Sequence, residues 1–462
     1  MRKAILLFLF FLIGILHAQT LPEIENLGLW CVYIETANGE EPTCDVLSPP
    51  EGCWGESITQ KNNVSCRIYI SNAGNLLYDS GTFVEKQSGA TIRVRGNTSA
   101  SQFEKKPYKI KLQKKTDLLC RDNDKYDDKD WLLIKNWGLR GLIGFKMNEL
   151  LGMPYTPQFR YVNVVMNSVY KGTYLLCESI KRNTDCRINV SKSGYIFEYD
   201  AYWWKEDYYV DSGYDVPMNY TFKYPNNKDL TPEVLDSFED MIKTVELSIK
   251  TDEYNRYLDI DTFVLWILGQ DLLGNFDDAG SNIFLSKYDD TDDTKILMPC
   301  LWDFDGIMGT DQYLPYVFAN AHRSFYFQDL FKKKDFVNCY VAKYNEQAER
   351  ICCEMLSYID DFVKSDYGQA YKLSFEKDQS IWEFYTRLDM DKSFDAWVDL
   401  SVEWFTNRKL LLDNVVAQLK NTTNVDQVGK KKTTNNIYNI RGHRFSRIQK
   451  GLNIINNRVV LK

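Results

Sequence analysis

The chain has 462 residues, of which 44% are hydrophobic and 14% aromatic, so it carries enough apolar side chains for a large core. This composition excludes an intrinsically disordered protein. The formal net charge of −8 argues against a nucleic-acid-binding protein, because Lys and Arg contacts to phosphates supply most of that affinity.

Residues 1–18 have the pattern of a secretory signal peptide. Arg2 and Lys3 precede an apolar run from Ala4 to Leu16, and a small residue, Ala18, is suited to cleavage. A membrane anchor is the alternative, but the run is short for a bilayer span, and no later segment has roughly 18 apolar residues. We therefore predict a secreted, periplasmic or surface-held chain without a transmembrane segment.

Residues 19–88 are predicted to be β-rich. Short apolar runs (LWCVYIET, CRIYIS, NLLYDSGTF) alternate there with turn residues. This region also holds four of the eleven cysteines, and in an exported chain they are the best candidates for local disulfides: Cys31, Cys44, Cys53 and Cys66. A zinc site is the alternative, which the absence of a C-x-x-C pair and the presence of only three histidines disfavour.

Residues 89–420 contain no linker-like stretch and are predicted to form one domain. Near its start, Arg93 and Arg95 lie in ATIRVRGN, and Lys109 and Lys111 lie in YKIKL. Residues two apart in a strand share a face, so each pair could point the same way. The four cations could line one anion-binding cleft, or they could be ordinary solvated positions.

The following elements have clear boundary signals. The pattern over Leu139–Leu151 is helical and ends at Gly152-Met153-Pro154, a stop signal. Val162–Met166 and Gly172–Cys177 are predicted to form a hairpin joined at Asn167-Ser168. Past residue 320 the apolar spacing predicts helices at Phe336–Phe362, Ser374–Arg387 and Ser393–Leu419.

The tract Tyr199–Tyr209 contains Trp203, Trp204 and several tyrosines. It resembles an aromatic platform that binds a sugar or a peptide. Packing in the core, or an insertion that bridges two lobes, is the other interpretation.

Three polar residues downstream have the spacing of a phosphoryl-transfer site. Asn282 follows Asp277 by five positions, and Asp303 opens an Asp-Phe-Asp-Gly stretch. Kinases place a base Asp before a metal-binding Asn at this spacing, and a second metal-binding Asp later. An Asp and an Asn beside a Gly equally mark a surface turn. The run Leu297–Trp302, however, is predicted to be a buried strand, and a carboxylate at its end is costly unless paired or metal-bound.

Phosphoryl transfer requires these residue types. Mg²⁺ or Mn²⁺ takes oxygen ligands, which Asn282 and Asp303 can supply while water and ATP phosphates complete the shell. Asp277 would then face the acceptor hydroxyl. A carbohydrate-active enzyme that uses Asp303 and Asp305 is a further alternative, although residues two apart in a strand share a face and do not oppose each other.

Four blocks of sequence carry a resemblance to a known family. They are ATIRVRGNTSASQFEKKPYKIKL, DWLLIKNWGLRGLIGFKMNELLGMPYTP, VNVVMNSVYKGTYLLCESIKR and the two Asp segments. In this order they resemble the CotH family of atypical secretory-pathway kinases. The resemblance implies an α+β, atypical protein-kinase-like two-lobed fold, with a β-rich N-terminal lobe and a helical C-terminal lobe. It also implies phosphorylation of Ser or Thr in exported proteins.

The resemblance extends to single residues. Asp277 looks like the family's catalytic Asp, and Asn282 and Asp303 look like its metal-binding residues. The chain departs from ordinary kinases because no His-Arg precedes Asp277 and no G-x-G-x-x-G loop precedes the lysines, so side chains must contact the phosphates. Near Arg140, Trp137-Gly138 replaces an Asp that the family often has. The residues implied to bind the nucleotide are Arg93, Arg95, Lys109, Lys111 and Glu178.

Residues 421–462 differ in composition from the rest. A polar linker, NTTNVDQVGKKKTTNN, precedes a basic ending without acidic residues. Ile437–Ile440 and Leu452–Leu461 are predicted to be strands of a small β-module. The ending resembles the C-terminal sorting segments of exported proteins in Bacteroidota bacteria.

The predicted function is therefore an exported Mg²⁺-ATP-dependent kinase that acts on secreted or surface proteins. The acidic run Asp289–Asp293 could attract basic, Ser/Thr-rich substrate segments by electrostatic steering, or it could be a solvated loop. The alternative is a non-catalytic surface or adhesion protein on the same fold, because fold does not settle function.

Overall fold

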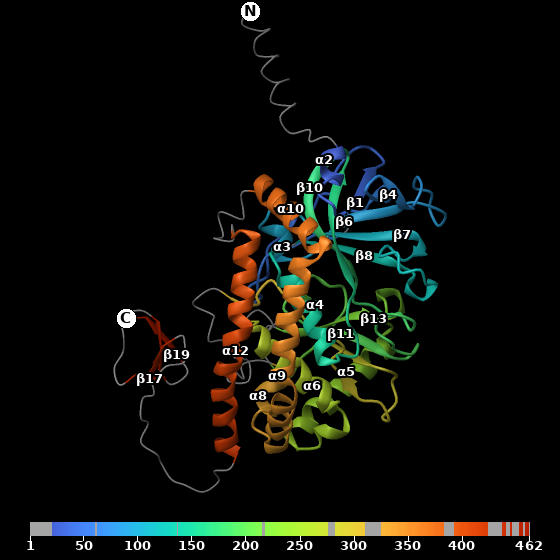
Figure 1. Cartoon of the computed structure of the whole chain (residues 1–462). Helices are drawn as coiled ribbons and strands as arrows, with labels where there is room; N and C mark the ends of the chain where they lie inside the picture. The colour runs from blue at the N-terminus through green and yellow to red at the C-terminus, as the bar shows by residue number, and fades with distance from the viewer. Residues whose placement is uncertain are drawn as a thin grey trace, which may run out of the picture.

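The computed structural model shows a β-rich N-terminal part and a C-terminal part dominated by helices (Figure 1). It describes residues 21–60, 62–135, 137–214, 218–275, 282–309, 325–382 and 392–423, together with four short strands beyond residue 436. The predicted α+β class, with strands first and helices later, is confirmed. The predicted signal peptide lies outside the described residues.

The N-terminal part is a closed barrel, which the sequence did not predict. Its strands are β1 (Trp30–Thr36), β4 (Val64–Asn72), β6 (Ala90–Val94), β7 (Tyr108–Thr116), β8 (Asp128–Lys135), β9 (Phe159–Met166) and β10 (Val169–Glu178). Hydrogen bonding follows the order β1-β9-β10-β8-β7-β6-β4, and β4 pairs again with β1. Strand β5 (Asn75–Asp79) pairs with residues Tyr69–Asn72 of β4, beyond the stretch where β4 pairs with β6.

Alternate residues of each strand fill the barrel. Ile68 and Ile70 of β4, Ile92 of β6, and Trp131 and Leu133 of β8 are all buried in one cluster. The residues between them point to the outer surface, as the period of two requires. Strands from both sides of residue 88 build this interior, so residues 19–88 and 89–420 contribute to one barrel.

Five further elements lie between the barrel strands in the sequence or precede them. Of these, β2 and β3 pair with each other in an antiparallel arrangement. The bounds of these elements are α2 (Leu21–Glu25), β2 (Val46–Leu47), β3 (Ser57–Ile58), α3 (Thr98–Ser101) and α4 (Arg140–Leu151).

Two local predictions are confirmed. Strands β9 and β10 form the predicted hairpin, and Asn167 and Ser168 at its turn have φ of 49° and 66°. Positive φ at both central residues is the property of a type I′ turn. Helix α4 ends as predicted, because Gly152 adopts φ 71° and its N–H bonds to carbonyls of the last turn.

The C-terminal part combines a second sheet with long helices. The sheet is antiparallel in the order β12-β13-β11-β14-β15, with β11 (Tyr195–Asp200), β12 (Tyr209–Asp211), β13 (Asn219–Tyr224), β14 (Ile283–Lys287) and β15 (Ile296–Leu297). The helices are α5 (Pro232–Lys250), α6 (Ile260–Leu273), α8 (Phe327–Leu330), α9 (Lys334–Lys364), α10 (Asp366–Ile381) and α12 (Phe394–Thr423).

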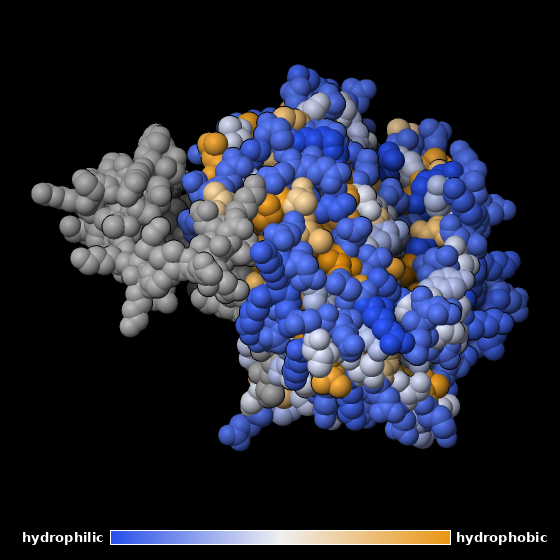
Figure 2. All heavy atoms as spheres, turned by 90° about the horizontal axis from the view of Figure 1, so that it is seen from below, coloured by the Kyte–Doolittle hydropathy of each residue, from blue (hydrophilic) through white to orange (hydrophobic). Residues whose placement is uncertain are grey.

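The helices predicted after residue 320 correspond to α9, α10 and α12. Helix α10 begins earlier than predicted, at Asp366, where the side chain of Ser365 caps its first turn. Its predicted end, Arg387, lies outside the described residues. The apolar faces of these helices share one large core with the second sheet, and the face seen in Figure 2 is mainly hydrophilic, with small hydrophobic groups.

The segment predicted as a buried strand before Asp303 is only partly a strand. Ile296 and Leu297 form β15, but the chain from Met298 onward is buried without joining the sheet. Side chains accept the hydrogen bonds of its backbone instead: Met298 N–H donates to Thr262, and Leu301 N–H donates to Asn148. These long-range side-chain partners cannot be seen in a local sequence pattern.

The predicted disulfides are absent, since all eleven cysteines are free. Cys31 and Cys66 lie on the paired strands β1 and β4, but Cys31 is opposite Ser71, and Cys66 is opposite Thr36. This register keeps the two sulfurs apart, and a disulfide requires close Cα atoms.

A fully buried ion pair joins the barrel to the helical part. Lys105 Nζ donates to both carboxylate oxygens of Asp378 on α10, at 2.6 and 2.8 Å, and to the carbonyl of Thr173 on β10 at 2.7 Å. Asp378 also accepts the N–H of Thr173 at 3.2 Å. Both partners are therefore held at one junction between β10 and α10.

The C-terminal residues form a four-stranded antiparallel sheet, ordered β17-β16-β18-β19. Its strands are β16 (Ile437–Asn439), β17 (Arg444–Phe445), β18 (Leu452–Ile455) and β19 (Arg458–Leu461), so the stretch predicted as one strand from Leu452 is a hairpin. Within the described residues, no helix combines the length and the apolar character needed to cross a membrane.

Candidate active site

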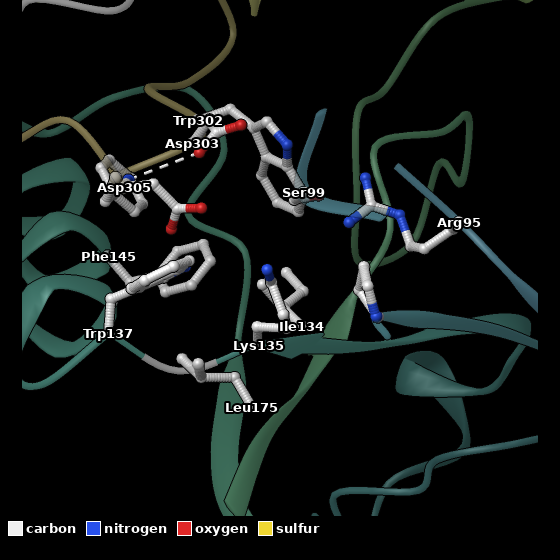
Figure 3. Close-up of a pocket in the computed structure, with 13 residues that line it drawn as sticks. Arg95, Ser99, Ile134, Lys135, Trp137, Phe145, Leu175, Trp302, Asp303 and Asp305 are labelled. Atoms are coloured by element: carbon white, nitrogen blue, oxygen red, sulfur yellow. Dashed lines mark hydrogen bonds between the residues drawn. The ribbon is translucent and has the colours of Figure 1, made fainter. Parts of the chain in front are cut away.

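A pocket lies where the barrel meets α4 and the Asp-Phe-Asp segment (Figure 3). Its volume of about 50 Å³ provides space for a few water molecules. Four charged side chains line it: Arg95, Lys135, Asp303 and Asp305. Most of the remaining wall is apolar or aromatic: Pro107, Ile134, Trp137, Phe145, Leu175, Trp302 and Phe304. Charges between such walls interact strongly, because little water screens them.

The Asp-Phe-Asp segment is held by its backbone. Arg140 Nη1 donates to the carbonyl of Asp305 at 2.7 Å, and Asn275 Nδ2 donates to the carbonyl of Asp303 at 3.1 Å. Asp303 adopts φ 60°, which Asp tolerates better than most residues. The N–H of Asp305 donates to Asp303 Oδ1 at 3.4 Å. With the carbonyls held, both carboxylates face the pocket (Figure 3).

Electrostatics around Asp303 and Arg95 reflect their burial. Burial raises the pKa of Asp303, and the charges of Arg95 and Lys135 oppose that rise. Burial lowers the pKa of Arg95, and Asp303 is the main charge that opposes the decrease. Among the described residues, none accepts a hydrogen bond from the Arg95 guanidinium. Arg95 is therefore a cation whose donors can serve a bound anion.

Lys135 is a site residue that the sequence reasoning missed. It ends β8, is 3% exposed, and its Nζ lies 3.8 Å from the ring centroid of Phe103 and 4.7 Å from that of Trp137. Burial lowers its pKa to about 7, although Asp305 and Asp303 oppose the decrease. The sequence contained a signal that could have identified it: Lys135 shares a strand face with the buried Trp131 and Leu133, and it interrupts their apolar pattern.

The other predicted cations do not line the pocket. Arg93 and Lys109 are opposite each other across β6 and β7, on the outer barrel surface. Arg93 Nη1 donates to Gln60 Oε1 at 2.8 Å, and Lys109 pairs with Asp130 at 3.2 Å. Lys111 is exposed. Of the four, only Arg95 reaches the pocket, because it follows the end of β6.

Glu178, the last residue of β10, is buried away from the pocket lining. Arg121 pairs with its carboxylate at 2.8 Å, the Tyr155 hydroxyl donates to it at 3.0 Å, and Gln158 N–H donates at 3.1 Å. These three partners make Glu178 part of a structural network.

Asp277 lies outside the described residues, as do its neighbours 276–281. The residues on either side contact the site region. Asn275 donates to the Asp303 carbonyl, and Asn282 donates its N–H to Glu198 Oε1 at 3.2 Å. Asn282 also has a positive φ of 63°, as Asp303 does. Glu198 on β11 pairs with Lys223 at 2.8 Å, and its charge reaches Arg95.

The pocket residues fit a hard divalent cation that takes one or two ligands from the protein and the rest from water and phosphate oxygens. Within the described ranges, no three His, Cys, Asp or Glu side chains converge on one point. Asp303 and Asp305 offer two carboxylates to the pocket. One or two carboxylates, with water and phosphate oxygens completing the shell, is the usual arrangement for Mg²⁺.

Close packing of α4 on the site gives a stability prediction. A Cβ at Gly144 would lie 2.0 Å from Cγ of Phe304, so Gly144→Ala must displace that ring. Although Ala normally favours a helix by about 1 kcal/mol, we expect a net loss of about 1–3 kcal/mol from overpacking, measured by denaturant unfolding. Gly141→Ala is the matched control, since its Cβ would meet only a flexible Leu175 methyl at 2.7 Å. An increase in stability for Gly144→Ala would contradict this packing.

Comparison with known proteins adds the family. Residues 92–412 match the family model described as CotH kinase protein. No curated protein matches the chain. The matched range contains every pocket residue and covers well over half of the chain, so the resemblance expected from the sequence is confirmed. The chain belongs to the CotH kinase protein family.

Proposed function

We propose that the chain is an exported kinase that uses ATP with Mg²⁺ or Mn²⁺ to phosphorylate Ser or Thr hydroxyls of secreted or surface proteins. One observation carries the proposal: Arg95, Lys135, Asp303 and Asp305 converge on one apolar-walled pocket. Paired cations and carboxylates suit a triphosphate whose charge is shared between a divalent cation and the protein.

The barrel and the helical part then take the places of the two lobes of a kinase-like fold. The pocket supports this assignment because the barrel supplies Arg95 and Lys135, whereas α4 and the Asp-Phe-Asp segment supply the opposite wall. Export rests on the pattern of residues 1–18, and surface delivery rests on residues 421–462.

Residue roles follow from position and chemistry. Bound ATP with its divalent cation supplies the transferable phosphoryl group and neutralises part of the phosphate charge. Asp303, Asp305 and Asn282 would hold the cation. Arg95 and Lys135 would donate to phosphate oxygens, and Asp277 would orient the acceptor hydroxyl. Four residues that the family resemblance implied as nucleotide contacts do not line the pocket and take no part in the phosphate binding proposed here: Arg93, Lys109, Lys111 and Glu178.

Nucleotide binding by Lys135 tests the proposal. Wild-type protein should show an ATP- and Mg²⁺-dependent thermal shift and should transfer the γ-phosphate to proteins of the native secretome. Lys135→Met should weaken ATP binding about tenfold or more, because it removes a charged donor from the pocket. Lys109→Met is the matched control and should change the affinity by less than about twofold, since Lys109 is committed to Asp130.

The pKa of Lys135 provides a second readout. A phosphate favours the charged lysine, whose pKa is about 7 in the free protein. ATP affinity should therefore fall as the pH rises from about 7 to 9, and Lys135→Arg should remove most of this dependence. If wild-type protein shows neither a thermal shift nor transfer with either metal, the kinase proposal fails, and a non-catalytic surface protein becomes the better interpretation.

A further inference from the structure

A group of aromatic residues, of which Trp54, Tyr208 and Tyr209 are exposed and Trp203 and Trp204 are half-buried, lies beside the loop that carries Arg95. We call Trp54, Trp203, Trp204, Tyr208 and Tyr209 the aromatic shelf. Trp54 is 56% exposed, Tyr209 43% and Tyr208 38%. The rings of Trp203 and Tyr209 have centroids 4.5 Å apart, and Trp204 Nε1 donates to the carbonyl of Trp54 at 3.3 Å. Exposed aromatics that adjoin one another are typical of interaction surfaces.

The shelf is attached directly to the pocket loop. Lys205, within the 3₁₀ turn Trp203–Lys205, donates to Asn97, and the hydroxyls of Tyr202 and Thr98 share a hydrogen bond of 2.8 Å. Asn97 lies in the loop that carries Arg95, and Thr98 begins helix α3 directly after it. A chain lying along the shelf would therefore pass beside the loop that forms one side of the pocket.

Five carboxylates lie within three residues of the shelf aromatics in the chain. They are Glu51, Glu56, Glu206, Asp207 and Asp211, and all but Glu206 are exposed. Asp207 and Asp211 accept hydrogen bonds from the amides of Asn227 and Asn219, at 3.4 and 3.1 Å. Glu206 interacts electrostatically with Lys205 and Lys223, whereas no Lys or Arg in the described part of the chain forms an ion pair with any of the other four. The shelf thus combines aromatic faces with negative charge.

We propose that the aromatic shelf binds a Lys- or Arg-containing segment of the protein substrate and delivers its hydroxyl side chains to the pocket. Basic side chains stack on Trp and Tyr faces and also pair with carboxylates, so they use both properties of the surface. A neutral sugar could stack on the rings and donate hydroxyl hydrogen bonds to the carboxylates, but it carries no charge to pair with them. The role of the segment as a substrate rests on the proposed kinase function, whereas binding itself needs no catalysis.

Peptide binding without nucleotide tests the shelf. A fluorescein-labelled peptide of Lys, Ser and Gly should bind wild-type protein, as measured by fluorescence anisotropy, and its Lys→Gln version should not. Raising NaCl from about 50 to about 500 mM should weaken the binding, because exposed charges are screened. Trp54→Ala/Tyr209→Ala should weaken it about tenfold, and Glu56→Gln/Asp207→Asn/Asp211→Asn should do the same. The exposed positions make both variants compatible with folding, which circular dichroism would verify.

The acidic run between the two Asp motifs provides the matched control. Asp290→Asn/Asp292→Asn/Asp293→Asn removes as many exposed charges elsewhere and should leave peptide affinity within about twofold. If this variant loses binding and the shelf variants keep it, the shelf proposal is overturned. Displacement of the peptide by a neutral oligosaccharide would also overturn it, in favour of a sugar site.

The two proposals can fail separately. Peptide binding that needs the shelf, in a protein without ATP-dependent transfer, would sink the kinase function and leave the shelf intact. Transfer to basic peptides with an unchanged KM in both shelf variants would support the kinase and reject the shelf.

Discussion

Asp303→Asn should lower the rate of phosphate transfer by about a thousandfold while leaving the fold intact. The Asn side chain lacks the charge that would hold the divalent cation. It has the same shape as Asp, it also tolerates φ 60°, and its Oδ1 can still accept the hydrogen bond from Asp305 N–H. ATP affinity in Mg²⁺ should drop, and affinity measured without metal should change much less. Steady-state kinetics and titrations with and without Mg²⁺ would measure both effects.

Thermal stability separates this catalytic role from a structural one. Burial raises the pKa of Asp303, so its ionised form costs stability at neutral pH, and Asn should leave the metal-free melting temperature equal or higher. Asp305→Asn is the comparison. If Asp305→Asn abolishes transfer and Asp303→Asn does not, the cation belongs to Asp305, and the assignment to Asp303 is wrong.

Lys105→Met should lower the free energy of unfolding by about 3–5 kcal/mol. The substitution leaves Asp378 fully buried at the junction of β10 and α10 without its counter-charge. Replacing both partners, as Lys105→Met/Asp378→Leu, should recover much of the loss, because no uncompensated charge is then buried. Chemical denaturation of the three proteins would measure these differences.

The exposed pair Lys364–Asp360 is the control for this prediction, because its side chains are 71% and 58% exposed. Lys364→Met should change stability by less than about 0.5 kcal/mol. If Lys105→Met lowers the free energy of unfolding by less than about 1 kcal/mol, water or a rearrangement stabilises the buried charge of Asp378. The ion pair would then not be what holds β10 and α10 together.

Local signals in the sequence predicted the local structure well. Asn167-Ser168 formed the expected turn because both residue types tolerate positive φ more readily than bulky ones, and Gly152 ended α4 for the same reason. The long helices α9 and α12 followed from apolar spacing. The four ordered sequence blocks that resembled the CotH family were sufficient to indicate the family that the match over residues 92–412 shows.

The predictions that were wrong or incomplete concern contacts between distant parts of the chain. Closure of the barrel depends on β4 pairing with β1, and the register of that pair keeps Cys31 and Cys66 from forming a disulfide. The extended segment after Leu297 lost its expected strand partners because Asn148 and Thr262, far away in sequence, bond its backbone.

The sequence by itself determined the α+β class, the family and the residue types of the candidate site. Only the tertiary structure decided which cations line the pocket. Strand spacing made Arg93, Arg95, Lys109 and Lys111 equivalent candidates and passed over Lys135. The folded chain placed Arg95 and Lys135 beside Asp303 and directed Lys109 to Asp130. The physical reason is that period-two alternation assigns a side chain to a strand face, whereas the partner opposite that face is set by barrel closure and by packing against α4.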